Sequence, residues 1–254
     1  PQPAARRVIA ALILREIAAR HGRLPGGYLW ALIEPAAVVA LLALAFSLML
    51  HTPALDTSFL LFYATGYLPF RTWQTVARLT AGAPRMARGL LAYPAVAPLD
   101  AIAATALLQV LTMAVVNAAL LGAVIAHEAP GQALAPGLML GAFGLAAGLG
   151  VATGLFNAVA FALVPVWRTL FDLLSRPLLL ASGVLFLPED LPPRLAEWLW
   201  ANPLLHITAL MRAGSYPYYT ASFAAPAYPA LAALVLALAG LLALRRARRL
   251  PDFG

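Results

Sequence analysis

Long runs of apolar residues recur along this 254-residue chain, and they constrain its fold more than any other feature. A helix needs about 20 mainly apolar residues to cross the hydrocarbon core of a bilayer. Six segments approach that length, which predicts an all-α membrane protein with six transmembrane helices. The predicted spans are residues 31–50, 58–77, 101–126, 136–158, 169–187 and 227–244.

Composition excludes the other classes of protein. Apolar residues make up 63% of the chain and charged residues only 11%, whereas a soluble domain carries about 25% charge. One soluble core cannot bury that much apolar surface, and disorder requires the opposite composition. Cysteine is absent, which excludes disulfides and thiolate chemistry.

Two of the predicted spans are imperfect. Gly66, Pro69 and Arg71 interrupt the second, which predicts a kink or an end that reaches water. The fifth must take in Asp172 and Arg176, which stand four residues apart and can neutralise each other on a helix.

The distribution of arginine predicts the orientation. All 17 basic residues are arginine, and with six spans fourteen of them fall on one side of the membrane. Basic loops face the cytosol, so both termini are expected there. The opposite loops hold only Arg194 and Arg212. Such placement indicates membrane topology and not binding of nucleic acid.

Two regions outside the spans stand out. Residues 1–27 form an arginine-flanked apolar segment that suits an interfacial helix on the cytosolic face. Residues 188–226 form a long outer loop with helix starts at Pro192–Pro193 and at Asn202, whose Pro203 follows as the first helical residue. We expect two short helices that dip to the membrane surface without crossing it, the second ending near Gly214.

Motifs for catalysis are absent. The phosphate-binding loop of ATPases requires a lysine, and the chain has none. His127–Glu128 lacks the second histidine of the zinc-protease motif, and no G-x-S-x-G sequence occurs. The chain is therefore predicted to be no enzyme, with no metal site and no cofactor of its own, and ATP hydrolysis would require another chain.

Small residues recur at helical spacing in the fourth span, where Gly137, Gly141, Gly144 and Gly148 form one stripe with Gly154 beyond it. Glycine lets helix backbones approach closely in lipid. The stripe could serve a dimer or a conduit, but ordinary packing within the chain is the favoured interpretation.

Arg71 lies near one end of the second span, beside Tyr67, Phe70 and Trp73. An arginine at this depth is costly unless it faces water or a partner, and aromatic faces suit sugar rings. One interpretation is a transport path for anionic cargo. The other is an arginine that snorkels to the interface or pairs with an acid such as Asp56.

Three motifs occur in a familiar order. Tyr28–Pro35 reads YLWALIEP, residues 84–99 contain Tyr93 and Pro94, and Asn202–His206 reads NPLLH. With the basic first segment and six spans, they resemble the ABC-2 family of export permeases, and most nearly its branch for capsular polysaccharide in Gram-negative bacteria. Relatives usually have lysine before Tyr93, where this chain has arginine.

The resemblance implies one ABC-2 transmembrane domain over 1–254, working as a homodimer in the bacterial inner membrane. It implies two copies of an ATPase that binds ATP and Mg²⁺, and a lipid-linked polysaccharide as cargo. Further partners are a periplasmic co-polymerase and outer-membrane export proteins. Residues 78–100 would form the cytosolic coupling segment, and 188–226 the outer gate. The coupling residues are Arg85, Arg88, Tyr93 and Pro94.

The same interpretation gives a set of expected site residues. Lipid phosphate would meet arginines of the inner segment, and cargo would slide past aromatic residues. The phosphate residues are Arg78, Arg85 and Arg88, and the path residues are Arg71, Tyr63, Tyr67, Trp73, Trp198 and Trp200.

Other functions remain as alternatives. A permease of the same superfamily for O-antigen, teichoic-type glycan or a small-molecule drug would look much the same. An intramembrane enzyme for polyprenyl lipids would need clustered aspartates for a metal, and the acids here are scattered. A simple anchor would need neither Arg71 nor the long outer loop.

Topology is the first testable prediction. Reporter fusions after Glu128 and after Leu244 should lie on opposite sides of the membrane, because an odd number of predicted spans separates them. Periplasmic phosphatase activity from the first fusion and cytosolic fluorescence from the second would measure this. Equal location of the two reporters would exclude six spans.

Overall fold

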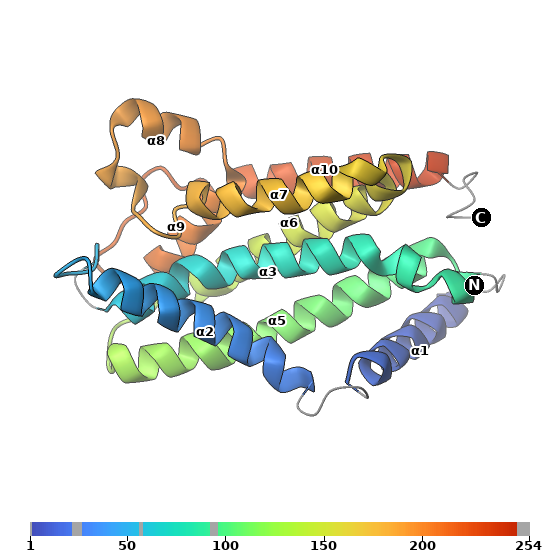
Figure 1. Ribbon diagram of the computed structural model, residues 1–254, viewed down its shortest axis with the longest axis horizontal. Coiled ribbons are helices and arrows are strands. Elements are labelled where there is room, and N and C mark those ends of the chain that lie inside the picture. Colours follow the sequence, from blue (N-terminus) through green and yellow to red (C-terminus); the bar gives the residue numbers. More distant parts are fainter. Residues whose placement is uncertain (1, 22–26, 56–57, 92–95, 248–254) are drawn as a thin grey trace.

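The fold is a bundle of long helices, seen in a computed structural model that describes residues 2–21, 27–55, 58–91 and 96–247 (Figure 1). All regular structure in these ranges is helical. The N-terminal helices are α1 (Gln2–His21), α2 (Gly27–Ser47), α3 (Phe59–Met86), α4 (Arg88–Leu91) and α5 (Pro98–Glu128). The others are α6 (Pro136–Leu163), α7 (Pro165–Ala181), the 3₁₀ turn η1 (Pro188–Asp190), α8 (Pro193–Leu199), α9 (Pro203–Ser215) and α10 (Ala227–Ala247).

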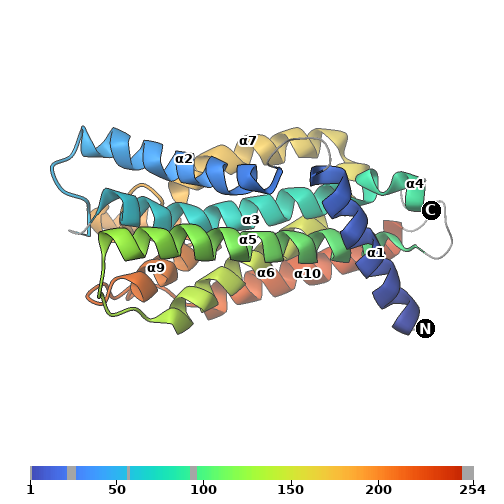
Figure 2. The same ribbon diagram turned by 90° about the horizontal axis from the view of Figure 1, so that it is seen from below.

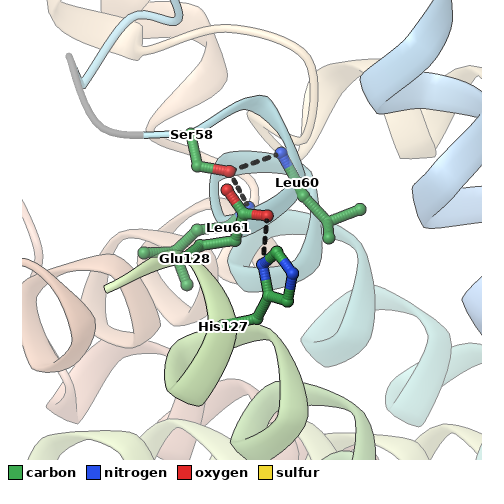
Figure 3. Close-up of polar contacts among 5 residues, drawn as sticks. All are labelled: Ser58, Leu60, Leu61, His127 and Glu128. Carbon is green, nitrogen blue, oxygen red and sulfur yellow. Dashed lines mark hydrogen bonds and ion pairs between the residues drawn. The ribbon is translucent and has the colours of Figure 1, made fainter. Parts of the chain in front are cut away.

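Helix α3 is the centre of the bundle and packs against α2, α5, α6 and α9 (Figures 1 and 2). Ser58 caps it, because the side-chain oxygen accepts from the N–H groups of Leu60 and Leu61 at 3.1 and 3.3 Å. Figure 3 shows this cap beside the end of α5, where His127 Nδ1 lies 3.1 Å from Glu128 Oε1. The helix runs on to Met86, so the start of the expected coupling segment continues the same helix.

The bundle turns apolar side chains outward. Among the described residues, four helices are long and apolar enough to cross a membrane: α2, α5, α6 and α10. Only 11% of the apolar window in α2 and 17% of that in α10 is buried. Such outward leucines require hydrocarbon as their solvent, since a water-soluble protein would bury them. These four helices coincide with the first, third, fourth and sixth predicted spans.

The other two predicted spans have a different character. Helix α3 is long enough at 28 residues, but it carries three arginines and buries most of its length. Helix α7 has only 17 residues and ends at Ala181, short of the predicted boundary at 187. A count of six spans therefore remains a prediction.

Arginine-bearing segments gather at one end of the bundle. The end of α3, the start of α7 and the end of α10 lie together there, while α8 and α9 lie at the other end (Figure 1). A single turn at Val164 joins α6 to α7, and Trp167 Nε1 donates to Asn157 Oδ1 across it at 3.0 Å. The expected interfacial helix is α1, which packs on α5 at this same end.

The interpretation of the glycine stripe as packing within the chain is wrong for its four regular members. A Cβ at Gly137, Gly141, Gly144 or Gly148 would meet nothing within 4 Å among the described residues, because these positions face outward. Close packing instead involves Gly150 and Gly154, which lie against α3. A Cβ at Gly154 would be 2.6 Å from Thr80 Cβ.

Both predicted outer helices are present, but their surroundings differ. Asn202 caps α9 as expected and accepts from the N–H of Leu204 at 3.0 Å. Helix α8 is largely exposed, whereas α9 is almost wholly buried against α3 and α6. Burial within the chain does not decide where α9 lies relative to the membrane surface, so that expectation stays a prediction. The run of apolar side chains and small residues in α9 suits a core position.

The close approach of α3 and α6 yields a second prediction. Gly154→Ala should lower the midpoint of thermal unfolding by several degrees, because overpacking costs about 1–3 kcal/mol. Gly122→Ala on α5 is the matched control, since its Cβ would enter open space. Light-scattering or tryptophan-fluorescence melts in detergent measure both. Equal melting of the two variants would contradict this packing.

Candidate functional site

Arg71 forms an ion pair with helix α2. Its Nη2 lies 2.6 Å from Glu34 Oε1, and its Nη1 donates to Gln74 Oε1 at 3.1 Å. Glu34 belongs to the sequence YLWALIEP, so this motif supplies the counter-charge for α3. Asp56, the partner considered from the sequence, lies outside the described residues. A carboxylate and a guanidinium that share a low-dielectric site neutralise each other and lower the cost of both.

The aromatic path candidates of α3 lie inside the bundle. Tyr63, Tyr67 and Trp73 are all buried. Tyr63 packs on Phe46 of α2, and Trp73 Nε1 donates to Thr153 Oγ1 of α6 at 3.2 Å. In this single chain they pack between helices, so a path past them requires α2 or α6 to move.

Arg78 lies apart from Arg85 and Arg88, the other two arginines expected to bind lipid phosphate. Its Nε lies 3.6 Å from Asp172 Oδ1 of α7, with both side chains substantially exposed. Asp172 thus pairs with Arg78 of another helix. The sequence analysis had instead paired it with Arg176 of its own helix. The pair connects α3 to α7.

Arg85 and Arg88 share their site with a third arginine, which the sequence analysis used only to predict membrane topology. Together with Arg168 of α7 they line a cavity of about 250 Å³ at the arginine-rich end. Apolar residues of α3, α6 and α7, including Pro84, Phe161 and Pro165, form the rest of its wall, and none of the described residues that line it is acidic. Guanidinium groups bind phosphate with paired donors, so the cavity suits a phosphate attached to an apolar group.

The remaining sequence-predicted residues divide between two places. Trp198 on α8 is 81% exposed, and the neighbouring Trp200 stacks on Phe223 with ring centroids 6.1 Å apart. Helix α8 lies at the end of the bundle opposite the end of α3 and the start of α7 (Figure 1). Tyr93 and Pro94, expected to couple to an ATPase, lie outside the described residues.

Arg212 is the polar residue that the sequence interpretation missed. It is only 1% exposed, although it was counted among the outer-loop charges. Burial lowers the pKa of Arg212 to about 10, so the guanidinium still carries its charge at neutral pH. The only sequence signal was its place in the NPLLH-containing helix, and that signal cannot indicate burial.

This chain is similar to known proteins along almost its whole length. The family described as "ABC-2 type transporter" matches residues 7–216. The polysialic acid transport protein KpsM of Escherichia coli is 32% identical over 94% of this chain and 93% of its own length. The capsule polysaccharide export inner-membrane protein CtrC of Neisseria meningitidis serogroup B is 29% identical, over 93% and 89%. BexB of Haemophilus influenzae, which bears the same description as CtrC, is 27% identical, over 92% and 89%.

The Glu34–Arg71 pair gives a third prediction. Glu34→Gln and Arg71→Gln should each lower the melting midpoint, because each leaves one charge without its partner. The double variant should lose less than the sum, with a coupling of about 1 kcal/mol. Melts of the four proteins in lipid nanodiscs measure this coupling, and strictly additive losses would show that the pair contributes no stability.

Proposed function

Because this chain belongs to the ABC-2 type transporter family, we propose that it is the transmembrane subunit of an ATP-driven exporter. Its cargo is lipid-linked capsular polysaccharide, carried across the bacterial inner membrane. The observation that carries this proposal is similarity over more than nine-tenths of the chain to proteins named for capsule polysaccharide export and polysialic acid transport. The arginine cavity and the aromatic residues on α3 and α8 supply chemistry that such a cargo needs.

The chain is a multi-pass protein with six spans, formed by α2, α3, α5, α6, α7 and α10. Helices α3 and α7 do not have the length and apolar composition typical of a span. Their Arg78–Asp172 ion pair reduces the free-energy cost of placing these charges in the membrane. Both termini face the cytosol, because the arginine-rich end of the bundle then lies inside.

Energy comes from a separate ATPase, present in two copies, that binds ATP and Mg²⁺. The absence of lysine supports this division, since no phosphate-binding loop can form in this chain. Residues 78–100 contact the ATPase through Arg85, Arg88, Tyr93 and Pro94. The first part of that segment is the last turns of α3, so the contact acts directly on the central helix.

The exporter is a homodimer. The outward stripe Gly137–Gly148 on α6 supports this proposal, because small residues on an open helix face allow a second helix to approach closely.

Cargo is handled at two places. Lipid phosphate is taken in at the arginine cavity by Arg85, Arg88 and Arg168, while Arg78 contributes less because Asp172 engages it. The sugar chain then passes Arg71, which meets anionic groups, and slides over aromatic faces in many weak contacts. Those faces belong to Trp198 and Trp200 and, once α2 or α6 has moved, to Tyr63, Tyr67 and Trp73.

Export in cells tests the proposal. A Gram-negative strain without its own capsule permease should regain surface polysaccharide when this chain and its ATPase are supplied. Arg71→Ala should reduce export by about tenfold or more at equal membrane abundance, because a charge-assisted contact to cargo is lost. Arg71→Lys should restore part of the activity.

The Glu34 pairing requires a control. In the double variant Arg71→Ala with Glu34→Gln, no carboxylate is left without its partner. Export should stay low if Arg71 meets cargo, and normal export would show that Arg71 only neutralises Glu34. A wild-type chain that binds the ATPase, exports no glycan and confers drug resistance would instead establish the small-molecule alternative.

A further inference from the structure

Arg212 connects three segments at the end of the bundle opposite the arginine cavity. From α9, its Nη1 donates to the carbonyl oxygen of Phe186 at 3.2 Å, and its Nη2 to that of Val184 at 3.1 Å. Its Cζ lies 4.0 Å from the centroid of the Phe62 ring on α3. One side chain therefore holds α9, the turn after α7 and the beginning of α3 together.

The contacts of this guanidinium are with neutral groups. The charge of Glu189 acts on Arg212, but this carboxylate is exposed and accepts from the Tyr219 hydroxyl at 2.9 Å. In the described part of the chain, Arg212 Nε is buried without a hydrogen-bond partner. A buried cation held only by carbonyl dipoles and a ring is less firmly fixed than one paired with carboxylate. Such a contact can form and break.

Gly66 makes the contact sterically possible. A Cβ at this position on α3 would lie 2.9 Å from Arg212 Nη2 and 3.0 Å from the Val184 carbonyl oxygen. Any side chain at residue 66 would therefore push the guanidinium and the turn away from α3. The sequence thus leaves a place on the central helix for this one contact.

We infer that Arg212 is a positioning residue that latches the outer end of the permease shut, by binding the Val184 and Phe186 carbonyl groups across α9, α3 and the turn after α7. The inference rests on the proposed export function, which requires this end to open. Opening separates α9 from the turn, and the guanidinium then leaves its two carbonyl groups. Closing reforms both hydrogen bonds and the stack on Phe62.

The natural absence of cysteine allows a direct test. Ser215→Cys, at a fully buried position near the end of α9, reports opening through its reaction with a water-soluble maleimide in lipid nanodiscs. Ser222→Cys, at an exposed position, is the labelling control. Arg212→Gln should accelerate labelling of the buried cysteine by about tenfold or more, because two charge-assisted hydrogen bonds favour the closed form. Labelling of the exposed cysteine should not change.

Three variants separate a latch from a general loss of packing. Gly66→Ala keeps the charge but disrupts the contact, so it should also accelerate labelling. Arg212→Lys retains one donor group and should give an intermediate rate. Arg194→Gln removes an exposed arginine from α8 at the same end and should have no effect. Acceleration by the first two variants, with no change in Arg194→Gln, supports the latch.

Protection of the buried cysteine in folded Arg212→Gln and Gly66→Ala proteins would overturn the inference. If Arg212→Gln does not reach the membrane, the labelling rates of Gly66→Ala and Phe62→Leu test the latch instead. Each of these variants weakens the contact without removing the charge. Glycan export measured alongside keeps the two proposals apart. A wild-type chain without export would refute the function, while the labelling rates would still report the latch.

Discussion

Within the bilayer, the polar groups of this chain must pair with other groups of the protein. Hydrocarbon cannot accept or donate hydrogen bonds, so backbone groups pair within helices and polar side chains turn inward. Helix α3 contributes three of these inward polar residues, with Thr65, Thr72 and Thr80 all buried. Thr72 also accepts from Asn117 Nδ2 of α5 at 2.9 Å. The central position of α3 agrees with its sequence, which is less apolar than those of α2, α5, α6 and α10.

The charged residues have different kinds of partner along the bundle. Arg71 pairs with Glu34 over a short distance, and Arg78 reaches Asp172 over a longer one in a more exposed setting. Arg212, the most deeply buried, has carbonyl groups and a ring instead of a carboxylate. Arg85, Arg88 and Arg168 lie around a cavity that is otherwise lined by apolar residues in the described part of the chain. The Arg71 and Arg78 ion pairs connect helices, while the chemistry of the cavity suits an anion from outside the chain.

Local features of the sequence predicted much of this arrangement. Apolar length located α2, α5, α6 and α10, and the Asn202-Pro203 pair located the start of α9. Features that depend on the approach of distant segments could not be predicted. The spacing of Gly137 to Gly148 resembles a packing stripe, yet Gly150 and Gly154 make the contact because helix rotation decides which face meets α3. The burial of Arg212 likewise depends on where Val184 lies, which no local pattern specifies.

The length of α3 relates the two ends of the molecule. At 1.5 Å per residue its 28 residues extend about 42 Å, so one helix carries Phe62 and Gly66 near its start and Arg85 near its end. Under the proposed function, an ATPase that displaces the Arg85 end acts on the same continuous helix that contacts α9. The Arg212 contact depends on separations of 4.0 Å or less, so a small shift of α3 is enough to break it. Hydrolysis at one end can therefore open the other without a flexible relay between them.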